Sequence, residues 1–246
     1  MKSSFFEWGD FGHHRHGKQI LVWTESIGEG RTIDMRQSSL TQIAHTGVIL
    51  ALAALVSTGC GNPADGVQEA NVAEPSGPGA PETTGAKVYQ VSSESTVHFT
   101  GSKVTGSQNG GFREFTGTIA VKDDQIVSPS EIVIDMESTW TESGDRLTNH
   151  LKNADFFDVP NYPTSRFVVT GVEPSGDGHK VTGDMTLRGV TKSISFDAEV
   201  SVSDSGVTLR AEFFIKRFDF GVAFKGKADD LIRDEVVLKL EIKASA

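Results

Sequence analysis

The sequence predicts an all-β protein, an eight-stranded antiparallel barrel with one short helix. Eight segments within residues 87–246 alternate apolar and polar side chains, the pattern of a strand with one buried face. These segments lie at residues 97–99, 115–121, 132–136, 167–171, 181–187, 194–200, 209–215 and 236–242. Stretches of glycine and small polar residues separate several segments and are expected to form turns, at residues 109–111, 175–178 and 203–206. Eight antiparallel strands can form a sandwich or a barrel, and glycines at strand positions favour the strongly curved sheet of a barrel.

The single helical pattern lies near residues 145–154. Asp145 is the expected N-cap, and Leu147 and Leu151 recur on one face at helical spacing. Pro160 and Pro163 prevent the helix from continuing. A short amphipathic helix of this kind is expected to cover one end of the barrel.

Composition excludes several classes of function. The formal net charge is −10, and residues 61–246 supply all of it. So acidic a chain has no general attraction for nucleic acid, and no nucleic-acid partner is expected. The chain contains one cysteine, which excludes an intramolecular disulfide and a multi-cysteine zinc site.

Residues 35–59 have the features of an export signal. The uncharged run GVILALAALV is too short to span a bilayer but suits the apolar core of a signal peptide. Small residues follow and lead directly to Cys60, so the stretch is similar to a bacterial lipoprotein signal. Ser57 departs from that pattern, which usually has Leu three residues before the cysteine. We therefore expect export to the periplasm or cell envelope, with a membrane anchor on lipidated Cys60; the alternative is an ordinary signal that leaves Cys60 as a free thiol.

The remaining N-terminal residues do not predict a fold. Residues 1–34, which include a histidine-rich stretch, are interpreted as an extension upstream of a natural start at Met35. Residues 60–86 are rich in glycine, proline and alanine and are expected to form a flexible tether. The folded domain is therefore expected to comprise residues 87–246.

Four strings within residues 87–246 resemble the YceI-like family. They are GGFREFTGTI at 110–119, LKNADFFDVPNYPTSRF at 151–167, GDMTLRGVTK at 183–192, and RFDFG at 217–221 followed by DEV at 234–236. Lys216 and Phe218 depart from the residues that are frequent in this family. The resemblance implies a lipocalin-like barrel that binds a polyisoprenoid or an isoprenoid quinone-like lipid in the bacterial cell envelope, with no cofactor. It leaves a homodimer open.

The alternation assigns residues to the barrel interior. Most of the phenylalanines share one phase, and the opposite phase would expose them to water at about 1.5–3 kcal/mol each. Glycines on the same face, among them Gly101, Gly117 and Gly183, are expected to leave a channel for the lipid tail. The expected ligand-binding residues are Phe99, Phe115, Ile119, Ile134, Leu147, Leu151, Phe156, Phe157, Phe167, Val169, Met185, Phe196 and Phe213.

Catalytic patterns are missing from the sequence. No nucleophile elbow, zinc-protease motif or phosphate-binding loop is present, and no catalytic or metal-binding residue is expected. Arg188 and Arg217 are interpreted as surface salt-bridge partners rather than headgroup ligands. The leading hypothesis is therefore non-catalytic lipid binding. The alternative is an envelope stress or interaction module whose barrel is filled by its own side chains.

Overall fold

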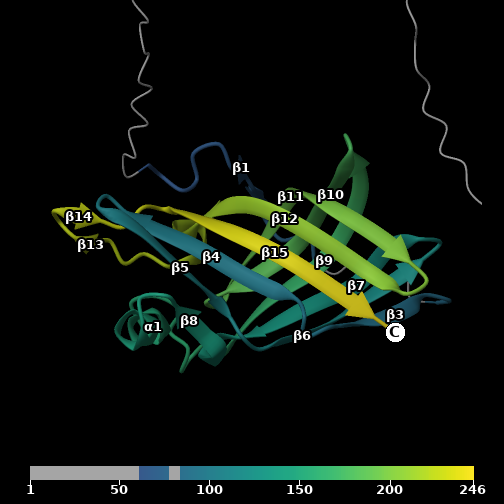
Figure 1. Cartoon of the computed structure of the whole chain (residues 1–246), viewed down its shortest axis with the longest axis horizontal. Coiled ribbons are helices and arrows are strands. Elements are labelled where there is room, and N and C mark those ends of the chain that lie inside the picture. The colour runs from purple at the N-terminus through teal and green to yellow at the C-terminus, as the bar shows by residue number, and fades with distance from the viewer. Residues whose placement is uncertain (1–60, 78–83) are drawn as a thin grey trace, which may run out of the picture. The chain divides into compact units, whose positions relative to one another are not determined.

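Eight antiparallel strands close into a ring in the part of the chain that the computed structural model describes, residues 61–77 and 84–246 (Figure 1). The ring strands are β3 (Lys87–Val91), β6 (Phe115–Lys122), β7 (Gln125–Asp135), β9 (Thr164–Ser175), β10 (Gly178–Leu187), β11 (Val190–Ser203), β12 (Gly206–Lys216) and β15 (Glu235–Ser245). Around the barrel their order is β12-β11-β10-β9-β7-β6-β3-β15, and β15 pairs with β12 to close it. The predicted all-β barrel is confirmed.

A second set of strands extends the wall at one end. It contains β4 (Thr96–Lys103), β5 (Gly106–Phe112) and β8 (Thr139–Thr141). Residues 237–241 of β15 pair with β4, whereas residues 244–245 on the same edge pair with β3. The wall is therefore continued by β3 and β6 toward one end and by β4, β5 and β8 toward the other.

The expected turn at residues 109–111 is wrong, because these residues belong to β5. Glycine is needed there for close approach to neighbouring strands. A Cβ on Gly110 would lie 2.5 Å from Cζ of Phe99, and a Cβ on Gly111 would lie 2.6 Å from the carbonyl oxygen of Val97. The glycines that suggested a turn thus make room for a cross-strand ring and a backbone carbonyl.

The predicted helix is α1 (Asp145–Lys152). Its N-cap is Gly144, with φ of 81°, so the expected cap, Asp145, is instead the first helical residue. No side chain caps this end. Shorter elements complete the described part: β1 (Gln68–Glu69), β2 (Asn71–Ala73), the 3₁₀ turns η1 (Met136–Ser138) and η2 (Arg217–Phe220), and the small hairpin of β13 (Gly226–Lys227) and β14 (Asp230–Leu231).

Part of the expected tether is ordered. Residues 61–77 lie against the barrel: β1 pairs with β12, β2 pairs with β11, and Ala70 is only 2% exposed. The composition of this segment did not indicate the pairing. Pairing with the edge of a strand uses the backbone N–H and C=O groups, and every residue except proline has both. The predictions for residues 1–34, 35–59 and Cys60 concern a part of the chain outside the described residues.

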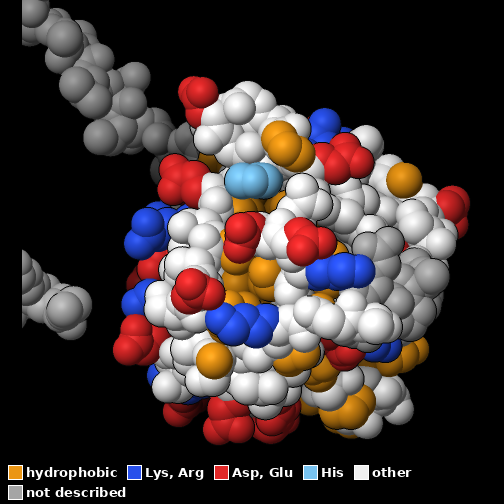
Figure 2. All heavy atoms as spheres, turned by 90° about the vertical axis from the view of Figure 1, so that its right-hand side faces the viewer, with side chains coloured by type: hydrophobic (Ala, Val, Ile, Leu, Met, Phe, Trp, Pro, Cys, Tyr) orange, Lys and Arg blue, Asp and Glu red, His pale blue; other side chains and the backbone are white. Residues whose placement is uncertain are grey.

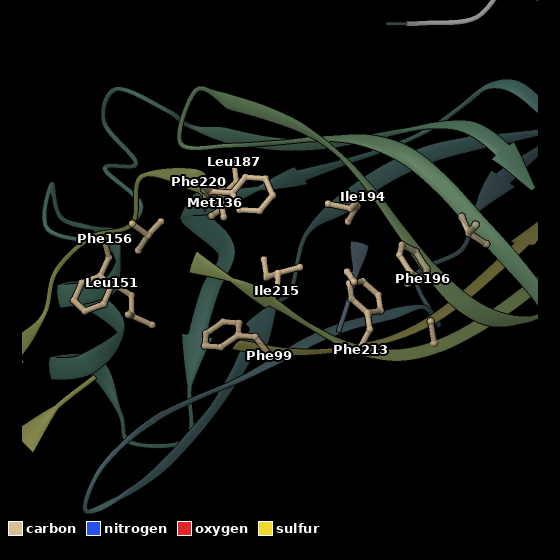
Figure 3. Packing of buried hydrophobic residues seen from close by; sticks show 14 of the residues in the cluster. Phe99, Met136, Leu151, Phe156, Leu187, Ile194, Phe196, Phe213, Ile215 and Phe220 are labelled. Atoms are coloured by element: carbon tan, nitrogen blue, oxygen red, sulfur yellow. The ribbon is translucent and has the colours of Figure 1, made fainter. Parts of the chain in front are cut away.

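Buried apolar side chains form two clusters inside the barrel. The larger cluster contains aromatic and aliphatic residues from β4, α1, β10, β11 and β12, several of which Figure 3 shows pointing inward. The smaller cluster gathers side chains of β3, β6 and β15, with Tyr89 and Val207 at its centre. The inward phase predicted from the alternation is therefore the one observed. Within residues 61–77 and 84–246, no helix has the length and apolar character of a membrane span.

Two phenylalanines on η2 provide a test of this packing. Phe220 is completely buried, whereas Phe218 is 43% exposed. We expect Phe220→Ala to lower the free energy of unfolding by about 3–5 kcal/mol, since it leaves a cavity in the core. Phe218→Ala should cost less than about 1 kcal/mol, because the Phe218 ring is partly exposed and the change removes mainly its contact with the guanidinium of Arg217. Urea unfolding measures both, and equal losses would contradict the packing described.

Candidate functional site: an apolar cavity inside the barrel

A cavity of about 620 Å³ lies inside the barrel. Its wall is formed by side chains of β4, β5, β7, β9, β10, β11, β12 and β15, by one face of α1, and by the segment that carries β13 and β14. Most of the lining is aliphatic or aromatic. The volume is within the range of about 300–1,000 Å³ that is typical of small-molecule sites.

Aromatic side chains that line the cavity pack against one another in groups, two of which lie along the strands. Phe99 lies with Phe112 and Phe157, at centroid distances of 5.7 Å and 6.4 Å. Farther along, Phe196 contacts Phe167 and stacks on Phe213, with centroids 4.0 Å apart and an interplanar angle of 11°. These rings come from β4, β5, β9, β11, β12 and the turn after α1, and the closed barrel brings them to one cavity.

Most of the expected ligand-binding residues line this cavity. They are Phe99, Ile134, Leu147, Leu151, Phe156, Phe157, Phe167, Met185, Phe196 and Phe213. Phe115, Ile119 and Val169 do not; they belong to the smaller cluster or pack against it. Their side chains point inward as predicted, but they lie at a different position along the barrel from the cavity. Alternation alone does not determine that position.

Other cavity residues were not selected from the sequence. Leu238 and Leu240 belong to a recognised alternating segment, so the signal for them was present. Phe112 ends the strand that was taken for a turn. Phe224 lies in an irregular segment and packs against Phe156, with centroids 5.2 Å apart, so no periodic pattern could have indicated it.

The glycines differ from one another in what they contribute. Gly101 lines the cavity, and a Cβ built on it meets no atom within 4 Å. By contrast, a Cβ on Gly183 would lie 2.4 Å from Cζ of Phe167, and one on Gly117 would lie 2.4 Å from the carbonyl oxygen of Glu131. Gly183 and Gly117 therefore serve close packing, and the expectation that they open the channel is wrong.

Polar side chains gather where the β4–β5 turn, α1 and the β13–β14 hairpin meet. Lys103, Gln108, Arg146 and Lys227 line the cavity here, and Asp230 is the only carboxylate among the described lining residues. A hydrogen bond from the Lys103 ammonium lowers the pKa of Asp230 below its usual value. This end of the cavity thus carries more hydrogen-bond donors and positive charge than acceptors.

The opposite end of the barrel has a different surface. Seen from the right-hand side of Figure 1, apolar side chains lie at the floor of a hollow (Figure 2). Acidic, basic and histidine side chains surround this hollow (Figure 2). The smaller apolar cluster contributes Ile242 and Ala244 from the C-terminal half of β15, so apolar packing continues toward this end.

Arg188 and Arg217 are not surface salt-bridge partners, contrary to the sequence-based interpretation. Arg217 is 4% exposed and donates to three carbonyl oxygens, those of Val222 (2.5 Å), Arg233 (2.8 Å) and Ile232 (3.1 Å). Its burial lowers the pKa of the guanidinium, and the nearby carboxylate of Asp234 offsets part of this effect. Arg217 thereby ties the segment that carries β13 and β14 to the barrel.

Arg188 has a similar structural role at the same end of the barrel. Its guanidinium donates to the carbonyl oxygen of Ala154 at 2.8 Å, just after α1, and to that of Gly221, just after η2. The two arginines therefore fix the pieces that cover this end of the cavity. Backbone carbonyls, rather than carboxylates, are the acceptors in both cases.

No site for a metal ion was found among the described residues. They contain no group of three or more histidine, cysteine, aspartate or glutamate side chains that could hold one. His98, His150 and His179 lie on β4, α1 and β10, and the contacts of His150 are an acceptor at 3.1 Å on Asp155 and the rings of two phenylalanines. None of these contacts forms a nucleophile–base pair.

Replacement of Arg217 tests its anchoring role. A lysine has one compact ammonium group and cannot reach three carbonyl oxygens in fork geometry. We expect Arg217→Lys to lower the free energy of unfolding by about 1–3 kcal/mol, because buried carbonyls lose their donor. Arg210→Lys, on the exposed face of β12, should change it by less than about 0.5 kcal/mol. Urea denaturation measures the free energy of unfolding of both variants. An Arg217→Lys protein as stable as the unmodified protein would contradict the anchoring role.

Comparisons with known proteins agree with this architecture. The structure is similar to that of Burkholderia cenocepacia BcnA, with a TM-score of 0.55 and 24% identity over 62% of this chain and 97% of that one. A polyisoprenoid binding domain from Saccharophagus degradans, implicated in plant cell wall breakdown, gives 0.52 and 18% identity, covering 64% of this chain and 98% of its own. At these levels of sequence identity, the structural similarity establishes the fold alone.

Sequence relatives give the same result. A UPF0312 protein of Pseudomonas putida is 39% identical over 93 residues, 37% of this chain and 47% of its own length. Protein YceI of Escherichia coli is 34% identical over 92 residues, 37% of this chain and 48% of its own length. The chain thus spans about half the length of these curated relatives. The profile of the YceI-like domain matches residues 89–244, which is most of the barrel, and the chain belongs to the YceI-like family.

Proposed function

We propose that the barrel binds one amphiphilic lipid with a long apolar tail, a polyisoprenoid or an isoprenoid quinone-like molecule, without chemical conversion. The observation that carries this proposal is the size and character of the cavity, about 620 Å³ with a mostly aliphatic and aromatic wall. Each buried methylene of a tail contributes about 0.8 kcal/mol. A tail also matches an elongated interior better than a compact ligand does.

The mostly apolar wall of the cavity favours an apolar occupant over water. Apolar cavities do not hold ordered water well, because water needs polar partners. The alternative of a barrel filled by its own side chains does not agree with this interior. The Saccharophagus neighbour, described as a polyisoprenoid binding domain, further supports the choice of ligand class.

The polar end of the cavity suggests how the lipid is oriented. Arg146 and Lys227 line that end, and Asp230, which is the only carboxylate among the lining residues that the structure describes, is already paired with Lys103. A polar headgroup there would meet donors, while the tail would lie along Phe99, Phe196 and the other rings. Because tails of similar length gain similar burial energy, the length of the cavity and this polar end must provide the selectivity.

A glycine substitution tests the site. Gly101→Leu should place a side chain in the cavity and reduce lipid that co-purifies with the protein, as measured by native mass spectrometry. Gly171→Leu is the matched control, since a Cβ there also meets no atom within 4 Å but Gly171 does not line the cavity. Equal lipid content in the two folded variants, or no lipid in the unmodified protein, would contradict the proposal.

We also propose that the protein is exported to the cell envelope and anchored through a lipid on Cys60. The basis is the apolar run at residues 47–56 that ends close to the only cysteine of the chain. Mass spectrometry of the mature protein is the test. We expect an N-terminal Cys60 whose mass includes acyl chains; a free thiol at Cys60 or cleavage at another bond would exclude the anchor.

A further inference from the structure

Beyond ligand binding, we infer that residues 68–73 form a displaceable strand that closes a lateral entrance to the cavity, between β11 and β12. This inference rests on the proposed function for the identity of what passes through the entrance. The entrance itself is argued from strand pairing, packing and exposure in the described residues. The segment precedes residues 89–244, so it lies outside the part of the chain that matches the family profile.

The strands β11 and β12 part from one another along more than half of their length. Their ladder runs from Ser203↔Gly206 only as far as Glu199↔Arg210. Beyond that point, residues 190–198 of β11 pair with β10 and residues 211–216 of β12 pair with β15, but the two facing edges do not meet. The ring therefore contains a seam whose edge groups need another partner.

Residues 68–73 fill this seam. Gln68 and Glu69 pair in parallel with β12 at Phe213 and Phe214, and residues 71–73 pair antiparallel with residues 193–195 of β11. A strand placed between two antiparallel neighbours must be parallel to one and antiparallel to the other, as observed. The backbone N–H of Ala70 also donates to the carbonyl oxygen of Phe214 at 2.9 Å.

The side-chain contacts of residues 68–74 are mostly exposed, whereas just after them the backbone N–H groups of Ser76 and Gly77 donate to the buried carboxylate of Asp184, at 3.1 Å and 2.9 Å. The side chain of Gln68 exchanges two hydrogen bonds with Asp197, at 2.8 Å and 3.0 Å. Salt bridges join Glu69 to Lys216 and Glu74 to Lys192, each at 2.6 Å, and the glutamates are half or more exposed. Exposed ion pairs stabilise weakly and are screened by salt. The strand is thus held less firmly than the eleven-residue ladder between β12 and β15.

Behind the strand lies the wall of the cavity. Ile194 and Phe196 of β11 and Phe213 and Ile215 of β12 all line it, and Figure 3 shows their side chains on the inner side of the sheet. The rings of Phe196 and Phe213 stack across the seam. Ala70 is buried beside them and is small enough to leave them undisturbed. If the strand leaves and the two rings separate, the cavity opens sideways to the surface.

A reversible crosslink tests whether the strand must move. Asn71 and Ser195 are cross-strand partners in an antiparallel pair, a spacing that suits a disulfide. Asn71→Cys/Ser195→Cys is made with Cys60→Ser, so that the introduced cysteines are the only thiols. The readout is the rate at which the protein takes up solanesol, a long polyprenol, from phosphatidylcholine vesicles.

The matched control places a disulfide in the same two strands where they pair directly. Glu199→Cys/Arg210→Cys, again with Cys60→Ser, joins exposed partners just beyond the seam. We expect oxidation of the 71–195 pair to slow uptake by about tenfold or more, because the crosslink removes the opened state from the ensemble. Reduction should restore the rate, and the 199–210 pair should have little effect. Equal rates for the oxidised and reduced 71–195 protein would overturn the inference.

Hydrogen exchange separates this inference from the proposed function. The Ala70 amide should exchange about tenfold or more faster than the amides of the β12–β15 ladder, since the strand opens without the barrel. If no form takes up solanesol but Ala70 exchanges early, the ligand proposal fails for this prenol and the displaceable strand is supported. If Ala70 exchanges only as slowly as the β12–β15 ladder, the strand opens only with the barrel and the inference is wrong.

Discussion

The closure of a small barrel around an apolar cavity is the constraint on which the rest of the structure depends. An eight-stranded barrel is just wide enough to be filled by its own side chains or to hold one slim ligand. Here a cavity of about 620 Å³ replaces part of the solid core. Stability must therefore come from the wall and from the ends, and β12 and β15 accordingly pair along their whole lengths. The smaller apolar cluster adds a packed region that surrounds Tyr89.

The end of the barrel near α1 shows how such a cavity is covered without a packed core beneath it. Arg217 and Arg188 reach backbone carbonyls on three irregular segments and hold them over the barrel. Arginine suits this task because its planar guanidinium offers five donors in a rigid arrangement and remains charged when buried. A sequence shows that an arginine is present, but it does not show whether carboxylates or carbonyls accept its hydrogen bonds. For that reason the sequence-based interpretation as surface salt bridges was wrong.

The features that could be predicted from the sequence are those that depend on local patterns. Alternation has a period of two residues, so it identified seven of the eight ring strands, all but β3, and the inward face of Phe99 and Phe213 correctly. Position along the barrel depends on register between distant strands, so Phe115 and Ile119 were assigned to the cavity although they lie in the smaller cluster. β5 was missed because its glycines serve close approach. The ordered segment before the barrel was missed because its pairing depends on backbone groups.

Under the proposed lipid anchor on Cys60, that segment would also orient the domain. A fully extended chain spans at most about 3.6 Å per residue, so the eight steps from Cys60 to Gln68 reach less than about 30 Å. The reach is shorter in fact, because Asp65 and Val67 donate backbone hydrogen bonds to residues three positions earlier. A lipid on Cys60 would therefore hold the seam between β11 and β12 close to the bilayer, where apolar tails are available. A long flexible tether would impose no such orientation, so the pairing of residues 68–73 with the barrel couples the proposed anchor to the proposed entrance.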